Sequence, residues 1–161
     1  MTATSRAEQL AAQFTAGNDT AIAAIAGCTA EGWQRSTASE GWTVAAAAHH
    51  LAAVQQVFVG LVTVLASGET SSPPPGMDDI DRSNAQHAEE YAAVGKAETL
   101  AILRTSGAAL AQLLRGLDDA QLDSVAGTFG GQELRVAQVV ERVVMGHAGV
   151  HLASIQAALV A

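Results

Sequence analysis

Cysteine is almost absent from this sequence of 161 residues, which holds only Cys28. A single cysteine excludes an intramolecular disulfide and is typical of a cytosolic protein, in which the side chain serves as a small buried apolar group. The first eight residues lack a basic patch followed by an apolar core, so we expect no secretory signal. The sequence therefore predicts a cytoplasmic protein in which Cys28 is not a nucleophile.

Basic residues are also scarce. Eight Lys and Arg stand against sixteen Asp and Glu, the formal net charge is −8, and Lys96 is the only lysine. Because phosphate contacts need a basic face, this charge excludes nucleic-acid binding. The most apolar segment, residues 54–66, is too short to predict a membrane span. We expect a small-molecule substrate as the binding partner, and neither a nucleic acid nor a membrane.

Sustained alternation of polar and apolar residues is missing as well, which predicts little or no sheet. Apolar residues instead recur at helical spacing and predict four long helices, over residues 4–27, 43–67, 83–117 and 134–160. The second and third helices are separated by residues 68–76, which include three consecutive prolines. We predict an all-α fold: a four-helix bundle with a long crossover between helices 2 and 3, in a single domain over residues 1–161.

Glycine indicates where these helices bend or stop. Residues 17–19 predict a kink or a break in the first helix, and Gly95 and Gly107 predict bends in the third. Residues 117–123 predict a short turn. Residues 125–134 are too rich in glycine for a helix, and the pair at 130–131 lacks the pattern of a phosphate-binding loop. This stretch is expected to be the irregular entry to the last helix.

Two histidines lie on the apolar face of the last predicted helix. His147 and His151 are one turn apart, and helical intervals from them reach Val140, Val143 and Ile155. An i, i+4 pair of histidines can hold one metal ion from a single helix face. The alternative is a pair of core histidines that hydrogen-bond to carbonyl groups.

A third histidine on another helix favours the metal site. His50 shares the apolar stripe of residues 43–67, whereas His49 lies about 100° further round the helix. Three neutral imidazoles suit a borderline divalent ion and leave a fourth position open, as in catalytic sites. Ser154 lies on the same face as His147 and His151 and is expected to support the ligands. We expect His87, beside two glutamates, to be a solvated surface residue.

These residues resemble a known family. Trp42-Thr43-Val44, His50 eight residues after the tryptophan, a Pro-bearing crossover and His147-x-x-x-His151 are similar to the DinB/YfiT superfamily of metal-dependent enzymes. Residues 32–51 also resemble the N-terminal domain of mycothiol-dependent maleylpyruvate isomerases, but we expect a single domain without the second one of those enzymes, which puts isomerase activity itself in doubt. The resemblance implies zinc or nickel held by His50, His147 and His151, with the tryptophan spacing selecting His50 over its neighbour. It also implies a low-molecular-weight thiol such as mycothiol or bacillithiol in some members.

Three functions follow as hypotheses. The first is a metal-dependent S-transferase or isomerase that activates a thiol against a small electrophile. The second is a hydrolase that activates water on the same three ligands. The third is a non-catalytic ligand-binding or dimerisation bundle, for which outward apolar residues such as Val59 and Val62 would form a homodimer interface. The sequence identifies no further catalytic residue.

Overall fold

The structure is a computed structural model that describes residues 4–69, 76–129 and 132–160. The elements in chain order are α1 (Arg6–Gly27), α2 (Ala30–Gln34), α3 (Val44–Ala66), α4 (Met77–Glu90), α5 (Lys96–Arg115), α6 (Asp119–Asp123), β1 (Val125–Phe129), β2 (Gln132–Arg135), α7 (Val136–Val139), the π-helix η1 (Val140–Met145) and α8 (Gly146–Val160).

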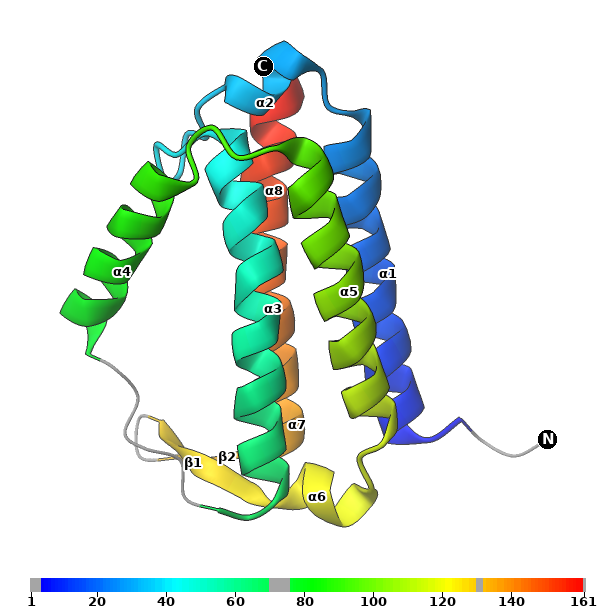
Figure 1. Ribbon diagram of the computed structural model, residues 1–161. Coiled ribbons are helices and arrows are strands. Elements are labelled where there is room, and N and C mark those ends of the chain that lie inside the picture. The colour runs from blue at the N-terminus through cyan, green and yellow to red at the C-terminus, as the bar shows by residue number, and fades with distance from the viewer. Residues whose placement is uncertain (1–3, 70–75, 130–131, 161) are drawn as a thin grey trace.

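Four long helical segments lie side by side: α1, α3, α5 and the continuous run from α7 through η1 to α8 (Figure 1). This arrangement confirms the predicted all-α bundle. Of the two alternatives expected at residues 17–19, a break into two helices is wrong, because α1 runs unbroken from Arg6 to Gly27 behind its N-cap Ser5. Asn18 does not cap a second helix and instead accepts a hydrogen bond of 2.7 Å from the Gln55 amide of α3.

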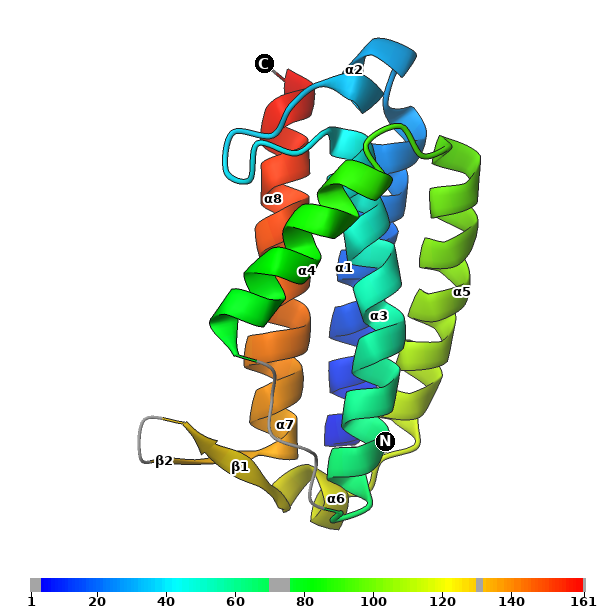
Figure 2. The same ribbon diagram turned by 60° about the vertical axis from the view of Figure 1, so that its left-hand side comes forward.

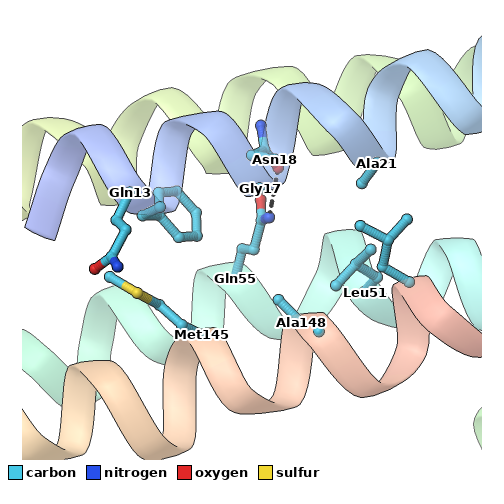
Figure 3. A pocket seen from close by; sticks show the side chains of 11 residues that line it. Gln13, Gly17, Asn18, Ala21, Leu51, Gln55, Met145 and Ala148 are labelled. Carbon is cyan, nitrogen blue, oxygen red and sulfur yellow. Dashed lines mark hydrogen bonds between the residues drawn. The ribbon is translucent and has the colours of Figure 1, made fainter.

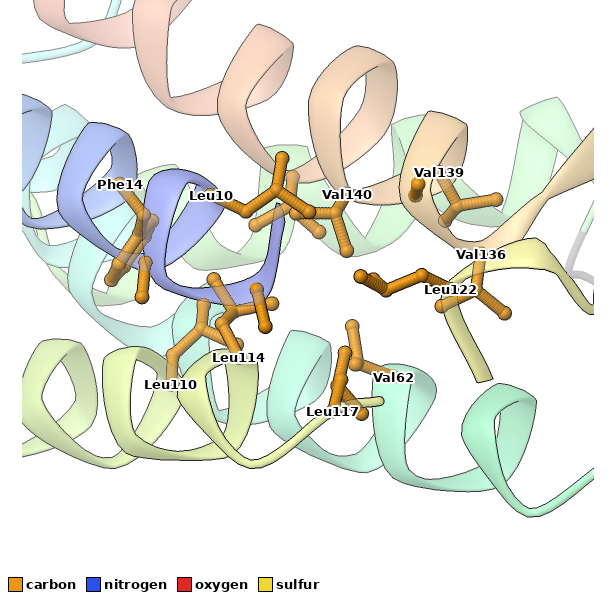
Figure 4. Packing of buried hydrophobic residues seen from close by; sticks show 14 of the residues in the cluster. Leu10, Phe14, Val62, Leu110, Leu114, Leu117, Leu122, Val136, Val139 and Val140 are labelled. Carbon is orange, nitrogen blue, oxygen red and sulfur yellow. The ribbon is translucent and has the colours of Figure 1, made fainter. Parts of the chain in front are cut away.

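The lower half of the bundle holds the larger apolar cluster, in which α1, α3, α5, α6 and α7 meet (Figure 4). Leu110, Leu114, Leu122 and Val136 are fully buried there. Val62 is also fully buried in this cluster, so its predicted outward position is wrong. A buried Val62 cannot contribute to a dimer interface, so this residue does not support the predicted homodimer.

The predicted third helix, residues 83–117, is in fact two helices. The chain leaves helical geometry after Glu90 and starts α5 at Lys96, with Gly95 as its N-cap. Two tertiary hydrogen bonds hold the break: Trp33 Nε1 donates to the Val94 carbonyl and Thr43 Oγ1 to the Ala92 carbonyl, both at 2.8 Å. Because these two carbonyl groups accept hydrogen bonds from side chains, they do not accept the backbone amides that a continuous helix would bring to them.

α4 therefore stands apart from the bundle. Its C-terminal turn lies against α3, whereas its N-terminal end points away (Figure 1) and it crosses the α3 and α8 face at an angle (Figure 2). Within residues 77–90, all of which are described, no residue is fully buried. Contacts to α3 near residue 87 thus hold this helix in place.

The lower end of the bundle is closed by short elements. Residues 119–123, predicted as a turn, form α6 with a capping box between Asp118 and Gln121. The predicted irregular entry is an antiparallel hairpin of β1 and β2, with a register shift between Val125 and Gly127. Residues 130–131 lie outside the described residues, as do residues 70–75 of the crossover.

Gly107, within the continuous helix α5, allows α1 to approach closely. A Cβ atom at this position would lie 2.4 Å from Asn18 Nδ2. Because Asn18 is tied to the buried Gln55, it cannot move aside without losing that hydrogen bond.

The overpacking in Gly107→Ala costs about 1–3 kcal/mol, against roughly 1 kcal/mol that alanine gains in helix propensity, so we expect the free energy of unfolding to fall by up to about 2 kcal/mol. Urea unfolding measures this change. Gly60→Ala in α3 is the matched control, since its Cβ would meet no atom within 4 Å, and it should leave stability unchanged or higher. Equal effects of the two substitutions would contradict the packing argument.

Two helical runs, Val44–Ala66 and Val136–Val160, are long and apolar enough to cross a membrane when judged by length and composition alone. In both, the most apolar window is partly buried in the bundle, half of it in the first run. Core helices of soluble proteins pass the same test, so this feature is weak evidence for a membrane span.

Candidate metal centre

The start of α3 fixes His50. Thr43 is the N-cap: its Oγ1 accepts from the Ala46 amide and donates to the Ala92 carbonyl. The five residues that follow, Val44 to Ala48, are all fully buried, so the first turns of α3 cannot rotate or slide. His50 comes directly after this anchored segment and is itself buried.

The π-helix η1 sets the direction of the other two histidines. Stepping back one α-helical turn from His147 predicts that Val143 faces inward, but Val143 is 41 % exposed and Val144 is buried instead. A π-turn holds one extra residue, so the inward register shifts by one position between α7 and α8. The inward Val143 is therefore wrong, while His147 and His151 still face α3.

The three predicted ligands meet in space. His50, His147 and His151 each offer one nitrogen, and the three nitrogens lie within 4.8 Å of one another. The Nε2 atoms of His50 and His147 are 3.2 Å apart. Two nitrogens that are each about 2.05 Å from a tetrahedral zinc ion are separated by roughly 3.3 Å, so this pair already has the spacing of two ligands.

Burial keeps His50 and His147 neutral. Burial, reinforced by the neighbouring histidines, lowers the pKa of His50 to about 3. Burial and His151 lower the pKa of His147 to about 4. Neutral imidazole is the form that binds metal, so both side chains are ready ligands at neutral pH. The donor set therefore fits a borderline divalent ion such as zinc or nickel.

Glu40 completes the arrangement and was missed in the sequence. Its Oε1 lies 3.0 Å from Nδ1 of His151, and its Oε2 accepts a short hydrogen bond from Ser154. Although burial favours the neutral acid, Ser154 and His151 hold the pKa of Glu40 below its usual value. An ionised Glu40 accepts the Nδ1 proton of His151 and leaves the Nε2 lone pair free for an ion. Ser154, predicted to support the ligands, does so through this carboxylate.

The sequence contains little indication of a role for Glu40 because this residue lies in the loop between α2 and α3. Ser36 and Thr43 form an isolated antiparallel bridge, and Gly41 at φ +72° lets the chain turn between them. This turn carries Glu40 across to α8, 111 residues later in the chain. No helical period predicts such a contact, and only the adjacent Trp42 indicated that the loop belonged to the site.

Glu40→Gln is expected to weaken divalent-metal binding by roughly 10–100-fold, because the amide cannot orient His151 as the carboxylate does. A competition titration against a chromogenic chelator measures this. Ser39→Ala is the matched control from the same loop, since Ser39 reaches Ser154 at 3.2 Å but does not touch the histidine. Unchanged affinity in the glutamine variant would show that Glu40 does not support the site.

Aromatic rings surround the three imidazoles. Trp42 stacks on His151 at 6.0 Å between ring centroids, and Phe58 meets His147 edge-on at 5.5 Å. His87 on α4 lies 5.1 Å from His50, so its predicted role as a solvated surface residue is wrong. With His49 beside His87, all five histidines of the chain belong to one connected group of rings.

A separate cavity lies on the other side of the seam between α3 and α8. It has a volume of about 110 Å³, and Leu51 and Ala148, the next residues after His50 and His147, line it (Figure 3). Asn18 and Gln55 supply polar groups at its wall, joined by their hydrogen bond. None of the three clustered histidines lines this cavity, so it is distinct from the metal centre.

Cys28 lies away from these rings, as expected. It is buried, and burial raises the pKa of its thiol. Its sulfur lies 3.2 Å from the Thr29 carbonyl and serves packing.

Comparison with known proteins gives one match. The family model of the DinB superfamily matches residues 13–155 and so covers α1 through most of α8, including the whole histidine cluster. No curated protein and no solved structure matches the chain.

Proposed function

The chain belongs to the DinB superfamily, and from this premise we propose that it is a metal-dependent enzyme whose ion is held by His50, His147 and His151. The observation that carries the proposal is the meeting of three imidazoles from two helices, with two Nε2 atoms 3.2 Å apart. A bound ion would supply Lewis acidity and lower the pKa of a thiol or water beside it.

The reaction we propose is attack of an external thiol on a small electrophile. The chain has no nucleophilic thiol of its own, since Cys28 is buried and its pKa is raised. The resemblance to mycothiol-dependent enzymes supports a low-molecular-weight thiol as the cosubstrate. The thiol would lose its proton to solvent, and its sulfur would form a bond to the electrophilic carbon. The bond from that carbon to its leaving group would break, and the leaving group would take the electron pair and a proton from solvent.

The residues around the ligands have clear tasks in this proposal. Glu40 holds the proton on Nδ1 of His151 and fixes the orientation of that ring. Trp42 and Phe58 cover two of the imidazoles and limit the access of water. The carboxylate of Glu40 lies directly beside the ligands, so the site favours an uncharged electrophile over a phosphorylated, anionic one.

The test is turnover of small electrophiles by the zinc-loaded and the nickel-loaded protein, with mycothiol, with bacillithiol and without thiol. The proposal expects turnover only with a thiol, and its loss in Glu40→Gln and His147→Ala. Turnover without thiol would support the alternative hydrolase. A metal-loaded protein that binds the electrophile but does not turn it over in either condition would favour a binding module.

A further inference from the structure

A second pair of histidines lies outside the three-histidine centre. His49 on α3 and His87 on α4 bring Nδ1 and Nε2 to 3.3 Å of each other. His49 is buried, and His87 is half-buried. His49 and His50 are neighbours in sequence but point about 100° apart round the helix, so the two pairs face different directions.

Two observations indicate what this pair binds. The separation of the two nitrogens is again the roughly 3.3 Å expected of two ligands on a tetrahedral ion. The negative charges of Glu90 and Glu98 act on His49 and favour a cation there.

The surrounding contacts hold the rings in this orientation. Tyr91 stacks on His49 with ring centroids 3.8 Å apart and planes 13° apart. Glu90 is three residues after His87, on the same face of α4, and its negative charge acts on both His87 and His49. His87 also contacts His50 edge-on, so the pair borders the first centre without sharing its ligands.

We propose that His49 and His87 form a second binding site for a borderline divalent transition-metal ion, completed by water, which fastens α4 to α3. This assigns a purpose to a helix that is otherwise weakly held, since no residue within 77–90 is fully buried. The inference concerns a site separate from the proposed catalytic centre and stands whether or not that centre turns over a substrate.

Zinc titration by calorimetry of chelator-treated protein tests the stoichiometry. The wild-type protein should bind about two equivalents, the tighter at the site with three protein ligands. His147→Ala should bind only the weaker zinc equivalent, at the His49–His87 pair. His87→Ala should bind only the tighter equivalent, at the three-histidine centre. Gln86→Ala, an exposed position on the same helix, is the matched control and should keep both.

The outcomes separate the two sites. If the three-histidine centre does not bind zinc, the wild-type protein should bind one equivalent. His87→Ala should lose this equivalent, and His147→Ala should keep it. A His147→Ala variant that binds no zinc while remaining helical would overturn the second site and leave a hydrogen-bonded pair. Retention of two equivalents by a folded His87→Ala variant would overturn it equally.

Proteolysis tests the attachment of α4 directly. Trypsin can cleave after Arg82, an exposed residue of α4 that pairs with Asp79 of the same helix. In His147→Ala, zinc at ten times its dissociation constant should slow this cleavage about tenfold, because the ion lowers the population of the detached helix. The His147→Ala/His87→Ala double variant should show no slowing. Equal slowing in both variants would show that the ion acts elsewhere.

Discussion

His50→Ala is expected to lose more than about 100-fold in divalent-metal affinity, since removing a direct ligand should cost more than removing a group that only orients one. Elemental mass spectrometry after dialysis would then find the tightly bound zinc or nickel of the wild type gone. The bundle should stay folded, because the core contacts of α3 are made mainly by Val44 to Ala48 and by Phe58, Val62 and Leu65.

The adjacent residue supplies the control. His49→Ala removes an equally buried imidazole from the same helix turn, yet its ring contacts His87 and Tyr91 and not the α8 pair. It should retain the tight ion. If His49→Ala loses that ion and His50→Ala keeps it, the assignment from the tryptophan spacing is off by one residue. If neither variant nor the wild type holds metal, both proposed enzyme activities fail.

The ligands could be predicted from the sequence because helical periodicity fixes direction. His50 shares the apolar stripe of α3, and His147 and His151 are one turn apart on the inward side of α8, so a bundle must bring them towards each other. The predicted register was nevertheless wrong one turn earlier at Val143. No residue type signals a π-turn, which lies in the valine-rich run of residues 139–144.

Features that depend on tertiary contacts could not be predicted in this way. Residues 91–94 favour helix, and the break between α4 and α5 arises because Trp33 and Thr43 take carbonyls of that segment. Glu40 reaches His151 only through the turn at Gly41. His87 appeared solvated because a single polar helix gives no sign of what it packs against.

The metal-free protein is expected to lose stability as the pH falls from 7 to 5. The folded-state pKa values of His50, about 3, and His147, about 4, lie below the usual histidine pKa of about 6.5. The unfolded chain therefore takes up protons in this range that the folded chain does not, so the free energy of unfolding falls with the pH and the loss is complete only near the folded values.

Each of the two residues contributes at most about 2 kcal/mol to this loss between pH 7 and 5, and solvent near the site and coupling between the rings reduce the sum to roughly 2–3 kcal/mol. Urea unfolding with chelator present at both pH values measures it. The His50→Gln/His147→Gln double variant is the control, since glutamine does not titrate, and its stability should depend less on pH by that amount. Parallel pH dependence in the two proteins would mean that these imidazoles are already protonated in the fold at pH 5. In that case burial would not hold these side chains neutral below about pH 6.5, and a metal ion would have to displace their protons at pH 5.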